Sequence, residues 1–460
     1  MLRRDLLRLI AAAPAASAQP RRPPNILYIL CDDLGWGDLR CYNPESAIPT
    51  PHADRLASQG VRFTDMHSPS SVCTPTRYGI LTGRYCWRSR LTKGVLRGYS
   101  PNLIEAGRLT VPSMLKARGY TTAGIGKWHL GLGDAETTDY SKPLRPGPTD
   151  HGFDSYYGIP ASLDMEPYLY FENDRAVEQP TARTEGRDTP RGVFWRGGGI
   201  APSFKLEDVL PTLTGKAVEY ISRNHEKPYF LYLPLASPHT PWLPDRKHQG
   251  KSRAGIYGDF VSMTDDAIGR VLAAVDPKNT LVILTSDNGA HWTPEDRAQF
   301  THRANANWRG QKADIHDAGH RVPFIASWQG RLAPGTVSAQ LGCLTDLMAT
   351  AAAIAGYQLP ANAGEDSFDL LGSPRREAVV HHSSEGMFAI REKNWKLILG
   401  RGSGGFTKPA FEKGPPAGQL YDLAADPGES TDLFEKEPDR VARLTALLDR
   451  YRTEGRSRPV

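Results

Sequence analysis

The sequence predicts an α/β protein with a large mixed, mostly parallel sheet flanked by helices and a smaller C-terminal α+β subdomain. Short apolar runs alternate with helical patterns over most of the chain, which indicates successive βαβ units. After about residue 360, the alternation is replaced by segments typical of antiparallel strands. The composition of the 460 residues, 39% apolar and 23% charged, excludes a disordered or fibrous chain.

The first predicted element is a buried strand over residues 25–30, all apolar after Asn25. A helix then starts with Thr50 as N-cap and Pro51 at its first position, and Gly60 closes it. The later elements are helices over 111–119, 208–223 and 260–275, and strands over 121–125, 229–234, 280–284 and 322–328. The Gly-, Arg- and Pro-rich stretch 170–203 predicts a long surface excursion.

The C-terminal part is predicted to contain antiparallel strands over 388–391 and 395–399 and an amphipathic closing helix over 437–452. We therefore place a main domain at residues 24–360 and a subdomain at 361–460.

The first 18 residues have the form of an export signal. Arg3 and Arg4 resemble a twin-arginine motif, and residues 16–18 form a small-residue cleavage site. We expect a periplasmic or secreted protein. The chain has no apolar run of about 20 residues, so no membrane span is predicted.

The charges and cysteines argue against several other classes of protein. The 56 Lys and Arg only slightly outnumber the 51 Asp and Glu and are scattered, which argues against nucleic-acid binding. No CxxC pair occurs, which argues against a zinc clip or a thioredoxin-type site. The cysteine count is odd, so at least one is unpaired or chemically altered, while export permits disulfides among the rest: Cys31, Cys41, Cys73, Cys86 and Cys343.

Polar residues follow four of the predicted strands. They are Asp32 and Asp33, Lys127 to His129, Ser237 to His239, and Ser286 to Asn288. Ligands of open parallel sheets bind at the carboxyl ends of the strands, so these residues should form one site. The side chains of Asp32, Asp33, Asp287 and Asn288 offer oxygen donors, which suit Ca²⁺ or Mg²⁺ rather than Zn²⁺.

The stretch 70–84 predicts an anion site. Pro75 fits the first turn of a helix, which places Cys73 just before the N-terminus and Arg77 within the first turn. A helix N-terminus and a guanidinium together favour a bound anion. A cysteine-dependent phosphatase is excluded, because it needs Arg six positions after its Cys and Gly79 stands there.

These motifs resemble the type I (formylglycine-dependent) sulfatases, relatives of arylsulfatase A and N-acetylgalactosamine-6-sulfatase within the alkaline phosphatase superfamily. Cys73 to Arg77 and Leu81 to Arg84 match the family signature, with Thr76 where Ser is usual. The resemblance covers roughly residues 25–435, and its other motifs lie at 32–38, 126–131, 237–241, 286–289, 309–312, 420–423 and 426–427.

The resemblance implies that Cys73 is oxidised to formylglycine (3-oxoalanine) by a formylglycine-generating or anaerobic sulfatase-maturating enzyme. In the hydrated aldehyde, one hydroxyl attacks sulfur and the second, once deprotonated, expels sulfate. Residues 24–360 would form the catalytic sulfatase domain.

The resemblance also implies roles for the other motif residues. One Ca²⁺ would be held by Asp32, Asp33, Asp287, Asn288 and the modified Cys73. Arg77, Lys127, His129 and Lys312 would compensate negative charge, and His129 would help deprotonate the second hydroxyl. His239 with Lys312 would protonate the leaving alcohol. Substrate would contact Lys127, His239, Lys312 and Ser162.

Some histidines and tryptophans are further candidates for the substrate cleft, with structural roles as the alternative: His151, His291, His302, His381, His382, Trp292 and Trp308. The expected substrate is a sulfated polysaccharide or glycosaminoglycan, or an aryl sulfate.

Two other functions stay open. A phosphomonoesterase or phosphodiesterase of the same superfamily would use a hydroxyl such as Thr74 or Thr76 and two Zn²⁺ ions, with Asp287 and His291 as a possible pair. However, Asn288 stands where that group has His. The other alternative is a catalytically inactive carbohydrate-binding protein.

Overall fold

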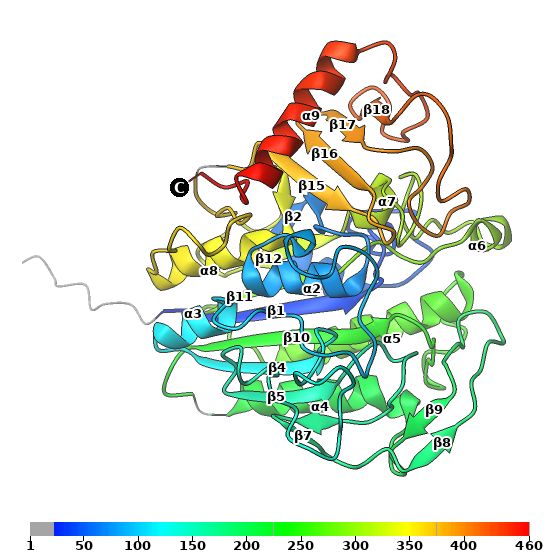
Figure 1. Cartoon of the computed structure of the whole chain (residues 1–460). Helices are drawn as coiled ribbons and strands as arrows, with labels where there is room; N and C mark the ends of the chain where they lie inside the picture. The colour runs from blue at the N-terminus through cyan, green and yellow to red at the C-terminus, as the bar shows by residue number, and fades with distance from the viewer. Residues whose placement is uncertain (1–22, 224, 374, 460) are drawn as a thin grey trace, which may run out of the picture.

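The computed structural model describes residues 23–223, 225–373 and 375–459, so the predicted export segment lies outside the described residues. A ten-stranded sheet crosses the molecule (Figure 1), in the order β13-β2-β12-β11-β1-β10-β4-β5-β6-β7. Its strands are β1 (Asn25–Asp32), β2 (Val61–Phe63), β4 (Thr121–Lys127), β5 (Ser155–Ile159), β6 (Phe171–Glu172), β7 (Arg175–Ala176), β10 (Tyr229–Pro238), β11 (Thr280–Ser286), β12 (Phe324–Ser327) and β13 (Thr336–Ser338).

The five central strands run parallel, and antiparallel pairs occur on both sides of them. β1 lies between β10 and β11 in parallel register, and β10 continues to β4 and β5. β12 pairs antiparallel with β11 and with β2. This arrangement confirms the predicted mixed, mostly parallel sheet.

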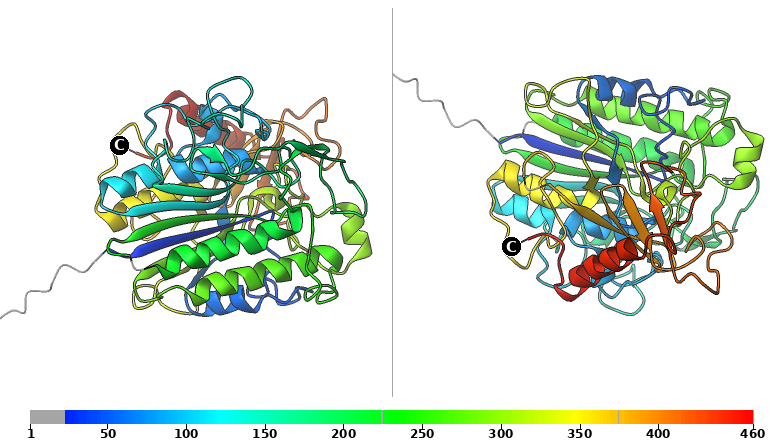
Figure 2. Two further views of the ribbon diagram at one scale, coloured as in Figure 1. Left: turned by 90° about the horizontal axis from the view of Figure 1, so that it is seen from below. Right: turned by 90° about the horizontal axis from the view of Figure 1, so that it is seen from above.

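Helices cover both faces of the sheet (Figure 2). One layer holds α1 (Pro51–Ser58), α4 (Val209–Ser222) and α5 (Gly255–Ala273), in which α5 contacts both α1 and α4. The other holds α2 (Cys73–Thr82), α3 (Val111–Ala117) and α8 (Leu347–Ala355). β1 is therefore buried on both faces, and Ile26 to Leu30 are at most 1% exposed. Each such aliphatic side chain contributes about 1.5–3 kcal/mol through burial.

The C-terminal subdomain has its own antiparallel sheet in the order β15-β16-β17-β18. The strands are β15 (Ala378–His382), β16 (Phe388–Glu392), β17 (Trp395–Ile398) and β18 (Gln419–Asp422). Helix α9 (Pro438–Thr453) contacts β16 and β17, and its buried face contains Leu444, Leu448 and Tyr451. The predicted strands and closing helix of this subdomain are confirmed. The boundary at residue 361 stays a prediction.

Several details differ from the sequence analysis. The stretch 170–203 is not an irregular excursion throughout, because β6 and β7 extend the main sheet and β8 (Ala182–Thr184) pairs with β9 (Gly198–Ile200). The Thr50 side chain does not cap α1, since its Oγ1 accepts the Arg40 N–H at 3.2 Å instead. The remaining elements are β3 (Met66–His67), paired with β14 (Gly342–Cys343), and the short helices α6 (Pro294–Gln299) and α7 (Asp317–His320).

All five cysteines lie in the described part of the chain and are free, so the disulfides that export would permit are absent there. Within the same residues, no helix combines the length and apolarity needed to cross a membrane.

Candidate active site

Four parallel strands deliver polar side chains to the carboxyl edge of the sheet. Asp32 ends β1, Lys127 ends β4, His239 follows β10 and Asp287 follows β11. Successive side chains of a regular strand point to opposite faces. Asp33, however, has a left-handed backbone (φ 64°), a conformation that Asp adopts more readily than most residues. The turn therefore lets Asp32 and Asp33 reach the same site.

Helix α2 brings Cys73 to this edge. Val72 is extended, α2 begins at Cys73, and all ten residues of the helix are buried. The Cys73 Sγ lies 3.6 Å from Asp32 Oδ1, so the predicted meeting of Cys73 with the paired acids is confirmed. Arg77 is the fifth helical residue, so it lies in the second turn and not in the first, because α2 starts at Cys73 and not after it.

Three buried cations neutralise three buried carboxylates. Arg77 donates from Nε and Nη2 to Asp287 Oδ2, at 3.1 and 2.7 Å. Lys127 Nζ donates to Asp32 Oδ2 at 2.5 Å. Lys312 Nζ donates to Asp33 Oδ2 at 2.8 Å. Each of these six side chains is less than 10% exposed. Buried charges are costly unless they are paired, so each cation compensates the carboxylate that it contacts.

Burial and the neighbouring charges lower the pKa values of two of the three carboxyl groups and raise the pKa of the third. Burial would raise the pKa of Asp32, but Lys127, His239 and Arg77 outweigh it and hold that pKa well below its usual range. Burial would also raise the pKa of Asp33, but the positive charge of Lys312 opposes it, and the pKa is lowered. Burial and the adjacent Asp32 raise the pKa of Asp287 despite Arg77. Further positive charge beside Asp287 would therefore favour its ionised form.

A chain of hydrogen bonds links Lys127, Ser162 and His239. Lys127 Nζ donates to Ser162 Oγ at 2.9 Å, and Ser162 Oγ lies 3.3 Å from His239 Nε2. His239 Nδ1 donates to the Thr240 carbonyl at 2.6 Å. Nε2 is then the nitrogen that faces the site, 3.7 Å from Asp33 Oδ2. The structure thus places Ser162 with the other predicted site residues.

His129 is held in one tautomer. Its Nε2 lies 2.7 Å from the Leu96 carbonyl, which can only accept, so Nε2 carries the hydrogen. Nδ1 is buried and has no partner among the described residues, which leaves its lone pair free. Burial, with Lys127 and Arg77 nearby, holds the pKa of His129 well below its usual range. Leu96 was not singled out from the sequence, because it acts through a backbone carbonyl that no side-chain pattern reveals.

The donor set fits a hard cation. Asn288 Oδ1 is buried and unpartnered within the described residues, while its Nδ2 donates to Asp33 Oδ1 at 2.6 Å. Ligand atoms of Asp32, Asp33, Cys73 and His239 lie within 4.8 Å of one another. An unpartnered amide oxygen beside three carboxylates is a donor set that suits a hard cation.

A second histidine cluster does not fit a metal. His67, His320 and His381 are fully buried and close together. The rings of His320 and His381 stack at 3.6 Å with an interplanar angle of 8°. Imidazole lone pairs lie in the ring plane, so two stacked, nearly parallel rings cannot aim theirs at one ion. The cluster is therefore a packing and hydrogen-bonding feature.

Most of the additional histidine and tryptophan candidates have structural roles. His302 Nε2 pairs with Asp38 at 2.8 Å, and His151 Nε2 with Asn102 at 2.8 Å. His382 Nε2 donates to the Thr92 carbonyl at 2.5 Å. The buried Trp292 packs against Tyr257, and Trp308 lies under the Arg321 guanidinium. Of these candidates, His291 lies beside the site.

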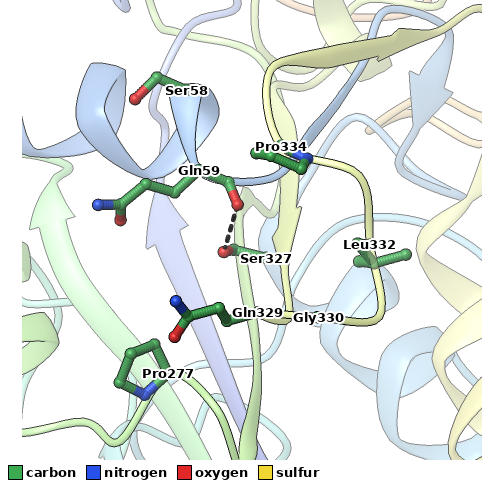
Figure 3. A pocket seen from close by; sticks show the side chains of 8 residues that line it. All are labelled: Ser58, Gln59, Pro277, Ser327, Gln329, Gly330, Leu332 and Pro334. Carbon is green, nitrogen blue, oxygen red and sulfur yellow. Dashed lines mark hydrogen bonds between the residues drawn. The ribbon is translucent and has the colours of Figure 1, made fainter.

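A cleft of about 250 Å³ lies at the opposite edge of the sheet (Figure 3). It is lined by Pro277, which precedes β11, and by Ser327, the last residue of the antiparallel β12. Ser327 Oγ donates to the Gln59 carbonyl across it at 3.2 Å. The cleft lacks the charged side chains that converge at the carboxyl edge, so the site described above remains the candidate.

Comparison with known proteins decides the family. The Sulfatase family model matches residues 24–357. The chain belongs to the sulfatase family. An N-acetylgalactosamine-6-O-sulfatase of Bacteroides thetaiotaomicron is 34% identical, over 95% of this chain and 94% of that one. Arylsulfatase A of Homo sapiens is also 34% identical, over 94% of this chain and 86% of that protein.

Solved structures agree with this assignment. A structure from work on the metabolism of multiple glycosaminoglycans by Bacteroides thetaiotaomicron is 32% identical, covers 94% of this chain and 100% of its own, and has a TM-score of 0.85. The PsFucS1 sulfatase from Pseudoalteromonas is 26% identical, with a TM-score of 0.75 and coverage of 94% and 90%. The protein is thus an enzyme that hydrolyses sulfate esters, which decides against the phosphatase and the inactive binding protein.

Proposed function

We propose that this sulfatase releases sulfate from a sulfated carbohydrate, using formylglycine made from Cys73 and one Ca²⁺. The observation that carries the proposal is the position of Cys73, 3.6 Å from Asp32 among paired carboxylates and cations. The carbohydrate assignment is supported by the relative named for N-acetylgalactosamine, aligned over 95% of this chain. An aryl sulfate is the second candidate, because arylsulfatase A is equally identical.

The thiol itself is a poor nucleophile here. Burial raises the pKa of Cys73, and Lys127 and Lys312 do not offset it, so little thiolate exists at neutral pH. Conversion to an aldehyde, whose hydrate carries two hydroxyls on one carbon, supplies both a nucleophile and a route for expelling sulfate. We infer that a formylglycine-generating or anaerobic sulfatase-maturating enzyme performs this conversion.

The cation would be held by the oxygens of Asp32, Asp33, Asp287 and Asn288 together with modified residue 73. When bound, Ca²⁺ supplies Lewis-acid polarisation of the sulfate group and lowers the pKa of the attacking hydroxyl. Lys127 and Lys312 remain available to share the charge of the sulfate oxygens, and Arg77 holds Asp287 in place. Preorganised cations of this kind often supply the largest single catalytic contribution.

His239 and His129 each take part in one of the two proton transfers of the reaction. His239 donates from Nδ1 to the Thr240 carbonyl, so Nε2 exchanges a proton with the leaving alcohol. Lys312 stands on the same side; burial opposes its charge, but Asp33 raises its pKa and keeps it protonated. His129, with Nε2 bound to the Leu96 carbonyl, presents Nδ1 to receive the proton of the second hydroxyl. A positioned acid or base contributes about 10²–10⁴-fold.

The test is Cys73→Ala assayed on regiodefined sulfated saccharides for released sulfate. The wild-type enzyme should hydrolyse at least one of them, and the variant should lose turnover while keeping nearly the same thermal stability, because the change removes only the small polar group that modified residue 73 carries. Turnover retained in the variant would refute the nucleophile assignment.

The place of action is a separate proposal. Residues 1–18 support export to the periplasm or outside the cell. We also propose a division into a catalytic domain at 24–360 and a subdomain at 361–460, which the separate four-stranded sheet of the C-terminal part supports.

A further inference from the structure

A loop of the C-terminal subdomain, residues 402–408, is bound to the segment that carries Lys312. The N–H of Ile315 donates to the Ser403 carbonyl at 2.7 Å. Thr407 donates to Asp314 twice, from its N–H to Oδ1 at 3.0 Å and from Oγ1 to Oδ2 at 2.5 Å. The buried Asp314 also accepts the Gln311 N–H at 3.0 Å. These bonds tie the loop to the residues that follow Lys312.

At Gly405, the backbone of the loop 402–408 is in direct contact with the backbone of the segment that carries Lys312. A Cβ at this position would lie 2.3 Å from the Ala313 carbonyl oxygen and 2.7 Å from the Asp314 nitrogen. Only a glycine permits this approach. The loop therefore has a fixed position relative to the active site, and the residue that follows Gly405 is fixed as well.

That residue is Phe406, which presents 47% of its surface to solvent. Its ring meets the ring of His291 edge-on, at 5.4 Å between centroids and 62° between planes. Ala290, the neighbour of His291, accepts the Lys312 N–H at 3.1 Å, and Arg191 donates to the His291 carbonyl at 3.1 Å. A large exposed aromatic ring on an anchored loop is therefore held against His291, whose neighbour Ala290 is bonded to the Lys312 backbone.

We propose that Phe406, supported by His291, packs against the sugar ring of the substrate and is a specificity-determining residue of this enzyme. The inference rests on the proposed function, in which Lys312 and His239 stand at the leaving oxygen. In this proposal the carbon skeleton of the leaving alcohol extends outward from that oxygen toward His291 and Phe406, which lie on the two segments that contact the Lys312 segment. The C–H face of a pyranose carries a weak positive potential, which matches the negative face of an aromatic ring. Carbohydrate is accordingly the substrate class that this rim recognises.

His291 suits this supporting role. Burial, with Arg191 and Lys312 nearby, lowers its pKa to about 3, so the ring is neutral at neutral pH. A neutral imidazole packs against Phe406 without adding a charge that would compete for the sulfate.

The experiment compares three single variants of the full-length enzyme on the best saccharide of the regiodefined panel. Phe406→Ala should raise KM about tenfold with little change in kcat, since tenfold corresponds to about 1.4 kcal/mol, in the upper part of the range for aromatic ring contacts. Phe406→Tyr should stay close to wild type, because it keeps the ring. The matched control is Phe411→Ala, which removes a ring 58% exposed on the same subdomain and should leave KM unchanged. Inhibition by inorganic sulfate, which lacks the sugar, should be the same in all four proteins.

Two outcomes overturn the inference in distinguishable ways. Equal KM values for Phe406→Ala and Phe411→Ala, with an active wild type, would refute the role of Phe406 and leave the proposed function standing. Failure of the wild type to hydrolyse any sulfated saccharide would refute both the role of Phe406 and the proposed function.

Discussion

Acidification should destabilise this sulfatase through the buried cluster of His67, His320 and His381. The three rings join β3, α7 and β15, so the cluster connects segments outside the main sheet to the sheet of the C-terminal subdomain. Burial, and then Arg321, lowers the pKa of His67 to about 4. Burial also holds the pKa values of His320 and His381 well below their usual range, with Lys396 adding to the effect on each.

The direction of the pH effect on the free energy of unfolding follows from the number of protons that the folded and unfolded states bind. Between about pH 4 and pH 6.5 the unfolded chain protonates these histidines and the folded protein does not, so the free energy of unfolding falls as the pH falls. At pH 5 an unfolded-state pKa of about 6.5 gives a loss of about 2 kcal/mol for each histidine that stays neutral when folded. His67 therefore accounts for about 2 kcal/mol of the loss between pH 7 and pH 5.

The perturbation is His67→Gln, which keeps a side chain able to hydrogen-bond with Asp65 and His320 but removes the titration. Urea unfolding at pH 7 and pH 5, followed by tryptophan fluorescence, measures the free energy of unfolding of both proteins. The loss on acidification should be about 2 kcal/mol smaller in the variant than in the wild type. His381→Gln should give a reduction of similar size. An identical loss in wild type and variants would refute the reasoning.

Two further predictions concern the active site. Chelation should suppress activity and Ca²⁺ should restore it, because Asp32, Asp33, Asp287 and Asn288 offer only oxygen donors; rescue by Zn²⁺ and not by Ca²⁺ would count against the donor-set argument. His239→Ala should lower kcat about 10²–10⁴-fold on a sugar sulfate but much less on 4-nitrophenyl sulfate, whose phenolate leaves without protonation. Equal losses on the two substrates would show that His239 does not protonate the leaving group.

Much of the site could be predicted because the sequence shows where the parallel strands end. The order of apolar runs indicates parallel strands, and parallel strands bring their carboxyl ends to one edge. That rule alone grouped Asp32, Lys127, His239 and Asp287, which the structure finds together. The helix at Cys73 was predictable from Pro75, with an error of one residue at its start.

Other features depend on long-range contacts that no local pattern encodes. Lys312 lies on an irregular segment and reaches Asp33 because its backbone binds Ala290; only the family resemblance indicated it. Strands β6 to β9 have two or three residues each, too few to show a period of two. Helix α5 begins at Gly255, a residue with low helix propensity, so its first turn was missed. The contact of Phe406 with His291 joins two loops 115 positions apart.

The most direct test of the account is mass spectrometry of the peptide that contains residue 73, isolated from active enzyme. We predict that this residue carries an aldehyde in place of the thiol, and that the modified fraction rises in parallel with specific activity across preparations. Full activity in enzyme whose residue 73 is entirely unmodified cysteine would contradict the account.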